Sequence, residues 1–167
     1  VGGVFRFAGG LDCNSIASWD GSDWHLMSSG MNNSINSLIV CSGELIAGGG
    51  FTKTGSVDVN RVARWDGNGW QPLGAGLNGV VNALTVYNDE LIVGGNFTKT
   101  GGIDANRIAR WNGSNWQPIG SGLNGNVYSL MVYKNELIAG GHFTKAGGTD
   151  INYIARWDVN SWQPMGS

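Results

Sequence analysis

A repeat of 46 residues runs through the whole chain and limits the folds that are open to it. Eight Trp residues fall into two series, and every step within a series is 46 residues. The first series is Trp19, Trp65, Trp111 and Trp157, and the second is Trp24, Trp70, Trp116 and Trp162. Residues 47–92 and 93–138 agree at 29 of their 46 aligned positions. We therefore expect a repeat protein in which each copy is one supersecondary unit.

The register of the repeat divides the chain without any insertion or deletion. We assign the units to residues of about 1–29, 30–75, 76–121 and 122–167, within a single propeller or propeller fragment that spans 1–167. The unit at 1–29 is incomplete, because it lacks a first strand of its own. The chain does not begin with Met and shows no signal peptide, which favours a processed or excised piece.

Each unit reads as four short strands. Residues 81–87 alternate apolar and polar side chains, and Asn88-Asp89 then supplies a two-residue hairpin turn into a second strand at 90–95. A longer connection rich in Gly, Thr, Asp and Asn follows. The third and fourth strands are expected at 107–111 and 116–119, and no segment has helical periodicity.

The stacking of such units predicts an all-β fold, a β-propeller of four-stranded blades. A small sheet with two apolar faces cannot bury both alone, but radial stacking of similar sheets buries them. The period lies within the range of propeller blades, such as those with WD-type repeats, whereas linear β-solenoid repeats are usually shorter. We expect about four blades per chain. The Gly-Gly pairs, as at Gly94-Gly95, should let one blade approach the next closely or form a bulge.

The repeat resembles a known family. A strand ending in Gly94-Gly95, then Trp111 followed by Asn and, after a short turn, Trp116, is similar to the kelch repeat. The phrases Gly-Gly-x-Phe-Thr and Asn-x-Ile-Ala-Arg-Trp look closer still to the kelch-like repeats of bacterial surface proteins and fungal cortical polarity-marker proteins. This resemblance implies a propeller fold and an extracellular or cell-surface location, and it specifies no single activity.

Composition excludes several classes of function. The net charge is −2 and only 13% of the residues are charged, which argues against binding to nucleic acid or to an anionic membrane. No apolar run is long enough for membrane insertion. The 29 Gly residues suit a chain with many tight turns and show no collagen period.

Two sets of repeated side chains are expected to have structural roles. We expect the Trp residues to fill the space between blades, with a ligand-stacking platform as the alternative. Arg64, Arg110 and Arg156 lie beside the first Trp series. We expect them to stack on a neighbouring Trp or to reach a backbone carbonyl, with a substrate clamp as the alternative.

The long loops contain the candidate binding residues. Asp and Asn recur there two residues apart, and such side chains either shape their own turns or contact a ligand or Ca²⁺. The candidate ligand-binding residues are Asp58, Asn60, Asn78, Asp104, Asn106, Asn124, Asp150 and Asn152. Lys53, Lys99 and Lys145 would supply a charged rim. The expected ligand is neutral and polar, such as a glycan, on the face opposite the short hairpins.

Nothing in the sequence points to catalysis. His25 and His142 occupy different repeat positions, and no nucleophile motif or His/Cys cluster is present, so we expect no catalytic residue, metal or cofactor. Cys13 and Cys41 should lie at opposite ends of the strands and remain free thiols.

Three functions therefore stay open. The first is a non-enzymatic scaffold for binding, either lectin-like or for protein interaction, whose uniform loops make it multivalent. The second is a purely structural repeat unit that assembles into a closed propeller. The third, an enzyme, is disfavoured by the uniform loops. We further expect self-association, most simply a homodimer that closes about eight blades, with a compact four-bladed monomer as the alternative.

Overall fold

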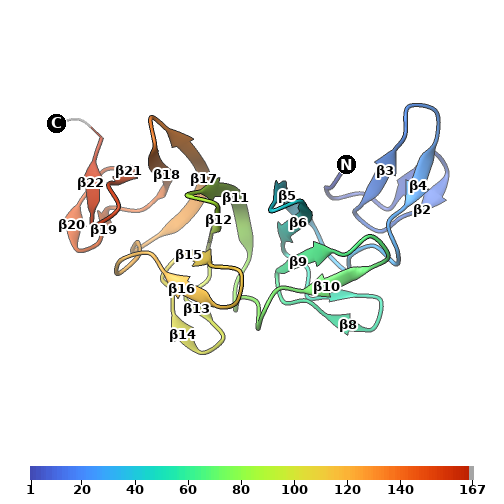
Figure 1. Cartoon of the computed structure of the whole chain (residues 1–167), viewed down its shortest axis with the longest axis horizontal. Helices are drawn as coiled ribbons and strands as arrows, with labels where there is room; N and C mark the ends of the chain where they lie inside the picture. Colours follow the sequence, from blue (N-terminus) through green and yellow to red (C-terminus); the bar gives the residue numbers. More distant parts are fainter. Residues whose placement is uncertain (166–167) are drawn as a thin grey trace.

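The computed structural model describes residues 1–165, which form 22 β-strands and no helix. The strands build a succession of antiparallel sheets along an open arc, with the N- and C-terminal ends of the chain at opposite ends of the arc (Figure 1). None of the described residues forms a helix that is long and apolar enough to cross a membrane. The all-β prediction is confirmed, and residues 1–165 form an open arc rather than a compact four-bladed ring.

Three complete four-stranded blades follow one another. Their strands are β5 (Ile35–Cys41), β6 (Glu44–Gly49), β9 (Val62–Trp65) and β10 (Trp70–Pro72); β11 (Val81–Tyr87), β12 (Glu90–Gly95), β15 (Ile108–Trp111) and β16 (Trp116–Pro118); and β17 (Asn126–Tyr133), β18 (Glu136–His142), β21 (Ile154–Trp157) and β22 (Trp162–Pro164). In each sheet the spatial order of these strands is their order in the chain. Each blade is therefore an up-and-down meander, as the sequence predicts.

The first hairpin of each blade turns where the sequence places it. Asn88 and Asp89 have φ values of 50° and 61°, and Tyr87 pairs with Glu90 across the turn. Positive φ at both central residues is the mark of a type I′ turn, which matches the twist of the flanking strands. Asn and Asp tolerate this conformation better than most residues, so the local sequence fixes the hairpin register.

A small second hairpin lies inside each long loop, where the sequence predicts a connection without strands. These hairpins are β1 (Phe7–Ala8) with β2 (Leu11–Asp12), β7 (Lys53–Thr54) with β8 (Val57–Asp58), β13 (Lys99–Thr100) with β14 (Ile103–Asp104), and β19 (Lys145–Ala146) with β20 (Thr149–Asp150). A two-residue strand is too short to show an alternating pattern, so periodicity could not reveal it.

The first unit contains only the outer half of a blade, β3 (Ala17–Trp19) and β4 (Trp24–Leu26). Gly2 forms an isolated bridge with Ile16, in the place where the end of a second strand lies in the other units. The predicted incompleteness of this unit is confirmed.

Neighbouring blades share their hydrophobic cores. Three clusters of buried side chains each contain one Trp of the second series, namely Trp70, Trp116 or Trp162. Trp116 Nε1 donates a hydrogen bond to the Leu73 carbonyl at 2.9 Å, and Trp162 Nε1 donates to the Ile119 carbonyl at 3.2 Å, both across a blade junction. The expectation that Trp residues fill the space between blades is confirmed for this second series.

Glycine is required where the inner strands meet. A methyl group added to Gly94 would lie 2.6 Å from Val127 Cγ1, and one added to Gly48 would lie 2.6 Å from Val81 Cγ1. These distances are far below van der Waals contact, so only glycine permits this approach, as predicted. At Gly140, in the last blade, the nearest atom is Ser129 Cβ at 3.9 Å, because no further blade covers that face.

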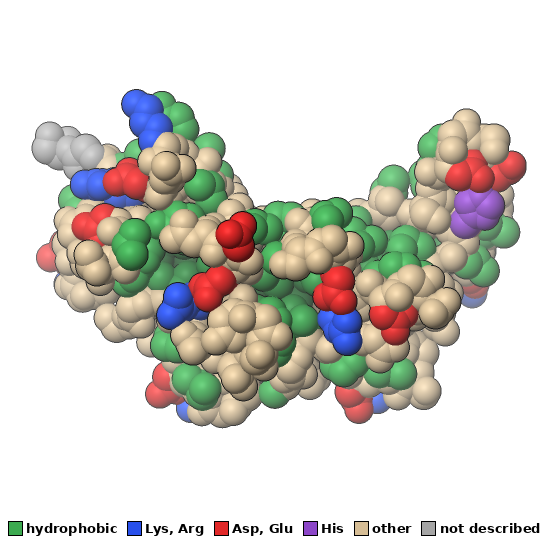
Figure 2. Space-filling model, in the orientation of Figure 1, with side chains coloured by type: hydrophobic (Ala, Val, Ile, Leu, Met, Phe, Trp, Pro, Cys, Tyr) green, Lys and Arg blue, Asp and Glu red, His purple; other side chains and the backbone are tan. Residues whose placement is uncertain are grey.

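Both ends of the arc expose apolar side chains. Trp19 is 51% exposed at the N-terminal end, while its counterparts Trp65, Trp111 and Trp157 pack against the cores. Tyr128 and Tyr133 of β17 are 56% and 52% exposed. Hydrophobic side chains also lie along the concave edge of the arc (Figure 2).

Candidate ligand-binding sites

The predicted asparagines between units are used to join loops. Asn78 Oδ1 accepts the backbone N–H groups of Thr98 and Lys99, both at 2.9 Å, and its Nδ2 donates to Thr98 Oγ1 at 3.0 Å. Asn124 makes the same three contacts with Thr144 and Lys145. These side chains thus hold the loop between blades against the next small hairpin.

The predicted aspartates are paired within their own hairpins. Asp58 contacts Lys53 Nζ at 2.6 Å, Asp104 contacts Lys99 Nζ at 2.7 Å, and Asp150 contacts Lys145. The three lysines that were expected to form a rim are therefore the partners of the aspartates. Because all these side chains are largely exposed, each pair contributes little to stability.

The remaining predicted asparagines lie at the ends of the long loops. Asn60 Nδ2 donates to the Ala75 carbonyl at 3.3 Å, and Asn106 Nδ2 donates to the Ser121 carbonyl at 3.2 Å. Asn152 occupies the same loop position one repeat later, and its counterpart for Ala75 and Ser121 lies outside the described residues. The structure brings Asn106 and Asn124 into the lining of one groove, and the role that it displays for most of the predicted residues is to build the loops.

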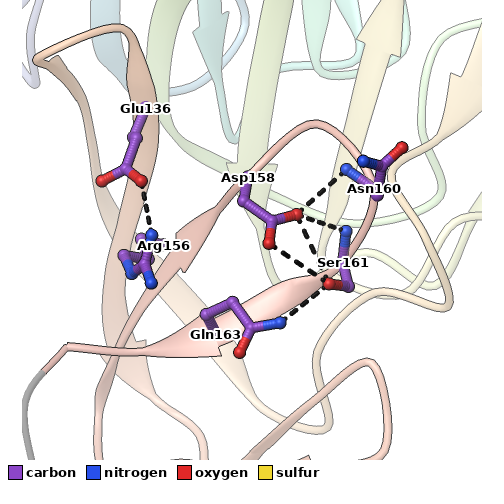
Figure 3. Close-up of polar contacts among 6 residues, drawn as sticks. All are labelled: Glu136, Arg156, Asp158, Asn160, Ser161 and Gln163. Carbon is purple, nitrogen blue, oxygen red and sulfur yellow. Dashed lines mark hydrogen bonds and ion pairs between the residues drawn. The ribbon is translucent and has the colours of Figure 1, made fainter.

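The three arginines beside the first Trp series have a different partner from the one expected. Arg64 pairs with Glu44 at 2.6 Å, Arg110 pairs with Glu90 at 3.1 Å, and Arg156 pairs with Glu136 (Figure 3). The strand register explains this, because third-strand Arg110 lies opposite Ile92 of the second strand, two residues from Glu90. The predicted stacking on Trp or bonding to a carbonyl is wrong for these residues. The signal that was missed is the recurrence of Glu at the same 46-residue step.

The second tight turn of each blade is closed by an Asp or Asn side chain. Asp158 Oδ1 accepts the backbone N–H groups of Ser161 at 2.8 Å and Asn160 at 3.1 Å (Figure 3). These two bonds hold the pKa of Asp158 below its ordinary value, and the bond from Ser161 has the larger effect. The Asn68 and Gly69 N–H groups lower the pKa of Asp66 in the same way.

Two equivalent pockets lie between blades on the face that carries the short hairpins. Their volumes are about 400 Å³ and about 330 Å³. The first is lined among others by Glu44, Ile46, Leu73 and Trp111, and the second by Glu90, Ile92, Ile119 and Trp157, which are the same positions one repeat later. The pockets differ where Cys41 in the first is replaced by Tyr87 in the second.

These pockets combine an apolar wall with charged hydrogen-bonding groups. Each has one Trp ring from the following blade and one Glu from the preceding blade, and Arg110 adds its guanidinium to the second. Acidic and basic side chains lie side by side at several points of the face shown in Figure 2. Within residues 1–165, no cluster of three or more His, Cys, Asp or Glu side chains is arranged to hold a metal. Cys13 and Cys41 are free thiols, as expected.

The meander blades, their radial succession and the glycine-mediated junctions define the chain as a β-propeller protein. Residues 72–165, more than half of the chain, match the family model of the Rax2 C-terminal beta propeller domain. The chain therefore belongs to the family of Rax2 C-terminal beta propeller domains, which confirms the resemblance to fungal cortical polarity-marker proteins. No curated protein matches the chain.

Proposed function

We propose that the chain is a non-enzymatic, lectin-like scaffold whose repeated sites bind the sugar rings of glycans. The observation that carries this proposal is the pair of equivalent pockets between blades, each with a partly buried Trp beside a Glu. A sugar ring presents C–H groups on one face and hydroxyl groups at its edge. An aromatic wall suits the first, and a carboxylate or guanidinium suits the second.

The recurrence of the pocket bears on affinity as well as on chemistry. Each site is small, so one sugar would bind weakly. Two sites at a fixed separation on one rigid arc would engage a branched or clustered glycan with higher avidity. Such ligands are abundant outside cells, so the extracellular or cell-surface location expected from the resemblance is part of this proposal.

The long-loop face, which contains the eight predicted Asp and Asn residues, is a second candidate binding surface. It favours protein interaction more than sugar binding, because Val57 and Ile103 are 42% and 50% exposed at the same position of successive small hairpins. Repeated exposed aliphatic side chains beside Lys–Asp pairs suit a polypeptide surface.

A glycan array followed by two matched variants distinguishes the faces. Glu90→Gln removes a carboxylate that borders both pockets, and Asp104→Asn removes a more exposed carboxylate on the long-loop face; each change breaks one ion pair. We expect Glu90→Gln to weaken glycan binding at least tenfold and Asp104→Asn to leave it unchanged. The reverse result would move the site to the long-loop face, and a wild-type protein that binds no glycan would contradict the lectin-like function.

We also propose that the two exposed ends of the arc associate between copies, most simply in a homodimer. The support is that Trp19 is exposed where Trp65, Trp111 and Trp157 are packed, and that the face of Gly140 is uncovered where those of Gly48 and Gly94 are filled. Each end thus presents part of a surface that is buried at the internal junctions.

A further inference from the structure

Two positions at the base of each long loop contact each other in three of the four units. Arg61 Nη1 donates to the Gly50 carbonyl, and Arg107 Nη1 donates to the Asn96 carbonyl. In the last unit the same two positions hold His142 and Tyr153, whose rings stack with centroids 6.0 Å apart. Arg107 also lines a groove beside its long loop.

The first unit has the same backbone at these positions but lacks the filling side chain. Ser15 stands where Arg61 stands one repeat later, with φ values of 71° and 74°. Ser15 N donates to the Phe5 carbonyl at 2.7 Å and Gly3 N donates to the Ser15 carbonyl at 3.0 Å, which repeats the backbone bonds of Arg61. The frame that positions an arginine is therefore intact while the arginine is absent.

The space left by this difference is a pocket of about 740 Å³. The equivalent groove two repeats later, which contains Arg107, has a volume of about 380 Å³. The two share their lining positions: Asn14 corresponds to Asn106, and Asn32 corresponds to Asn124. Thus the groove is about twice as large where the guanidinium is missing.

The lining of the large pocket is rich in oxygen acceptors. Ser15, Ser29 and Asn14 contribute hydroxyl and amide oxygens, and Val4 stands at the position whose carbonyl accepts the guanidinium in the sister units. Asn32 also lines the pocket, but its Oδ1 already accepts the backbone N–H groups of Thr52 and Lys53. Phe5 and Met31 add apolar surface that suits an alkyl stem. One lining residue is charged, Arg6, and it is paired with Asp12 at 2.8 Å.

We infer that this pocket binds the guanidinium group of an arginine from a partner polypeptide, in the place that Arg61 and Arg107 occupy in the sister units. A planar guanidinium has five donors and matches a cradle of carbonyl, amide and hydroxyl oxygens. An ammonium group is a more strongly hydrated point charge and would fit this cradle less well. The site is distinct from the sugar pockets, because it lies on the long-loop side of the first unit.

The test titrates the protein with N-acetyl-arginine amide and, separately, with N-acetyl-lysine amide, and follows the backbone amide NMR signals. We expect saturable shifts at Asn14, Ser15 and Asn32 with the arginine compound, with a dissociation constant on the order of 1 mM as befits a small ligand. The lysine compound should bind at least tenfold more weakly. Equal binding of the two compounds would overturn the assignment to guanidinium.

Two reciprocal variants test the location. Ser15→Arg should fill the pocket from within and reduce arginine-amide binding more than tenfold. Arg107→Ser should open an equivalent groove and raise the stoichiometry from one to two, with new shifts at Asn106 and Asn124. Unchanged binding in Ser15→Arg would overturn the proposal, and this variant remains decisive if Arg107→Ser does not fold. Glu90→Gln, which tests the sugar pockets, should not alter arginine-amide binding.

Discussion

Asn82 reaches across a blade junction and donates a hydrogen bond from Nδ2 to the backbone carbonyl of Val127 at 2.8 Å. Asn82 lies in the β-bulge of β11, where the register between Val81 and Ala83 shifts. The bulge frees the side chain to point along the ring instead of across its own sheet. Asn36 makes the same bond to Val81 at 2.9 Å, so the bond is a repeated link between inner strands.

We predict that Asn82→Ala lowers the free energy of unfolding by about 1–2 kcal/mol, because it leaves the buried Val127 carbonyl without this donor. Urea unfolding followed by Trp fluorescence measures the change. Tyr128 occupies the same position in the last described blade, whose outer face is uncovered among residues 1–165. Tyr128→Asn is therefore the matched control, because it introduces the same side chain where it has no neighbouring blade to bond. If Tyr128→Asn raised the stability by as much as Asn82→Ala lowers it, the bond across the junction would not be the cause.

A second prediction concerns the glycines at the junctions. Gly94→Ala should destabilise the fold by about 1–3 kcal/mol, because the added methyl group would overlap Val127 and force the blades apart. Gly140→Ala adds the same atom to the open face of the last blade and, at a concentration where the protein is monomeric, should change stability by less than about 0.5 kcal/mol. Calorimetric melting of both variants checks the difference, and equal melting temperatures would contradict the close approach between blades.

A third prediction concerns acid stability. Backbone N–H bonds lower the pKa of Asp158 in the folded state, so its contribution to stability is present above the unfolded value of about 3.9 and is lost as the pH falls through the lower folded value. Asp158→Asn should keep the turn, as Asn112 does by accepting the N–H groups of Ser114 and Asn115. Its melting temperature should therefore fall less between about pH 5 and about pH 2 than that of the wild type.

The reciprocal variant is Asn112→Asp, which places a carboxylate in the equivalent turn. Its melting temperature should acquire a steeper acid dependence than that of the wild type. If both variants melt in parallel with the wild type across this pH range, the turn carboxylates do not contribute to acid stability.

A fourth prediction concerns the ends of the arc. Sedimentation equilibrium should give a mass above the monomer value of 17.6 kDa that rises with concentration towards a dimer. Trp19→Glu should shift the equilibrium to the monomer, because it replaces an exposed apolar ring with a charged group. Ile103→Glu, on a small hairpin away from the ends, is the control. A well-folded wild-type monomer at micromolar concentration would rule out the dimer.

The repeat made the fold predictable, because each signal occurs several times at one spacing. The expected strands at 81–87 and 90–95 agree with β11 and β12, and the turn at Asn88-Asp89 has the expected conformation. The small hairpins were missed because strands as short as Lys99–Thr100 have no periodicity. Asn78 holds the start of this hairpin by accepting the N–H groups of Thr98 and Lys99.

The candidate sites were much less predictable, because they lie between units. Glu90 and Trp157 are far apart in the sequence and line one pocket only because the blades stack. The role of Arg110 depended on the pairing of β12 with β15, which places it near Glu90. The large pocket of the first unit has Ser15 in place of Arg, and the importance of this difference is visible only because the sister units show where the guanidinium lies.

The most direct test of the sugar-binding account is to follow the eight Trp indole N–H signals by NMR during titration with a glycan selected on the array. The account predicts that the signals of Trp111 and Trp157, which line the two pockets, shift and saturate together. The signals of the buried Trp116 and Trp162, whose N–H groups are bonded across blade junctions, should stay in place. Shifts confined to the backbone amides of Asp104, Asn106 and Asn124, with Trp111 and Trp157 unaffected, would contradict it.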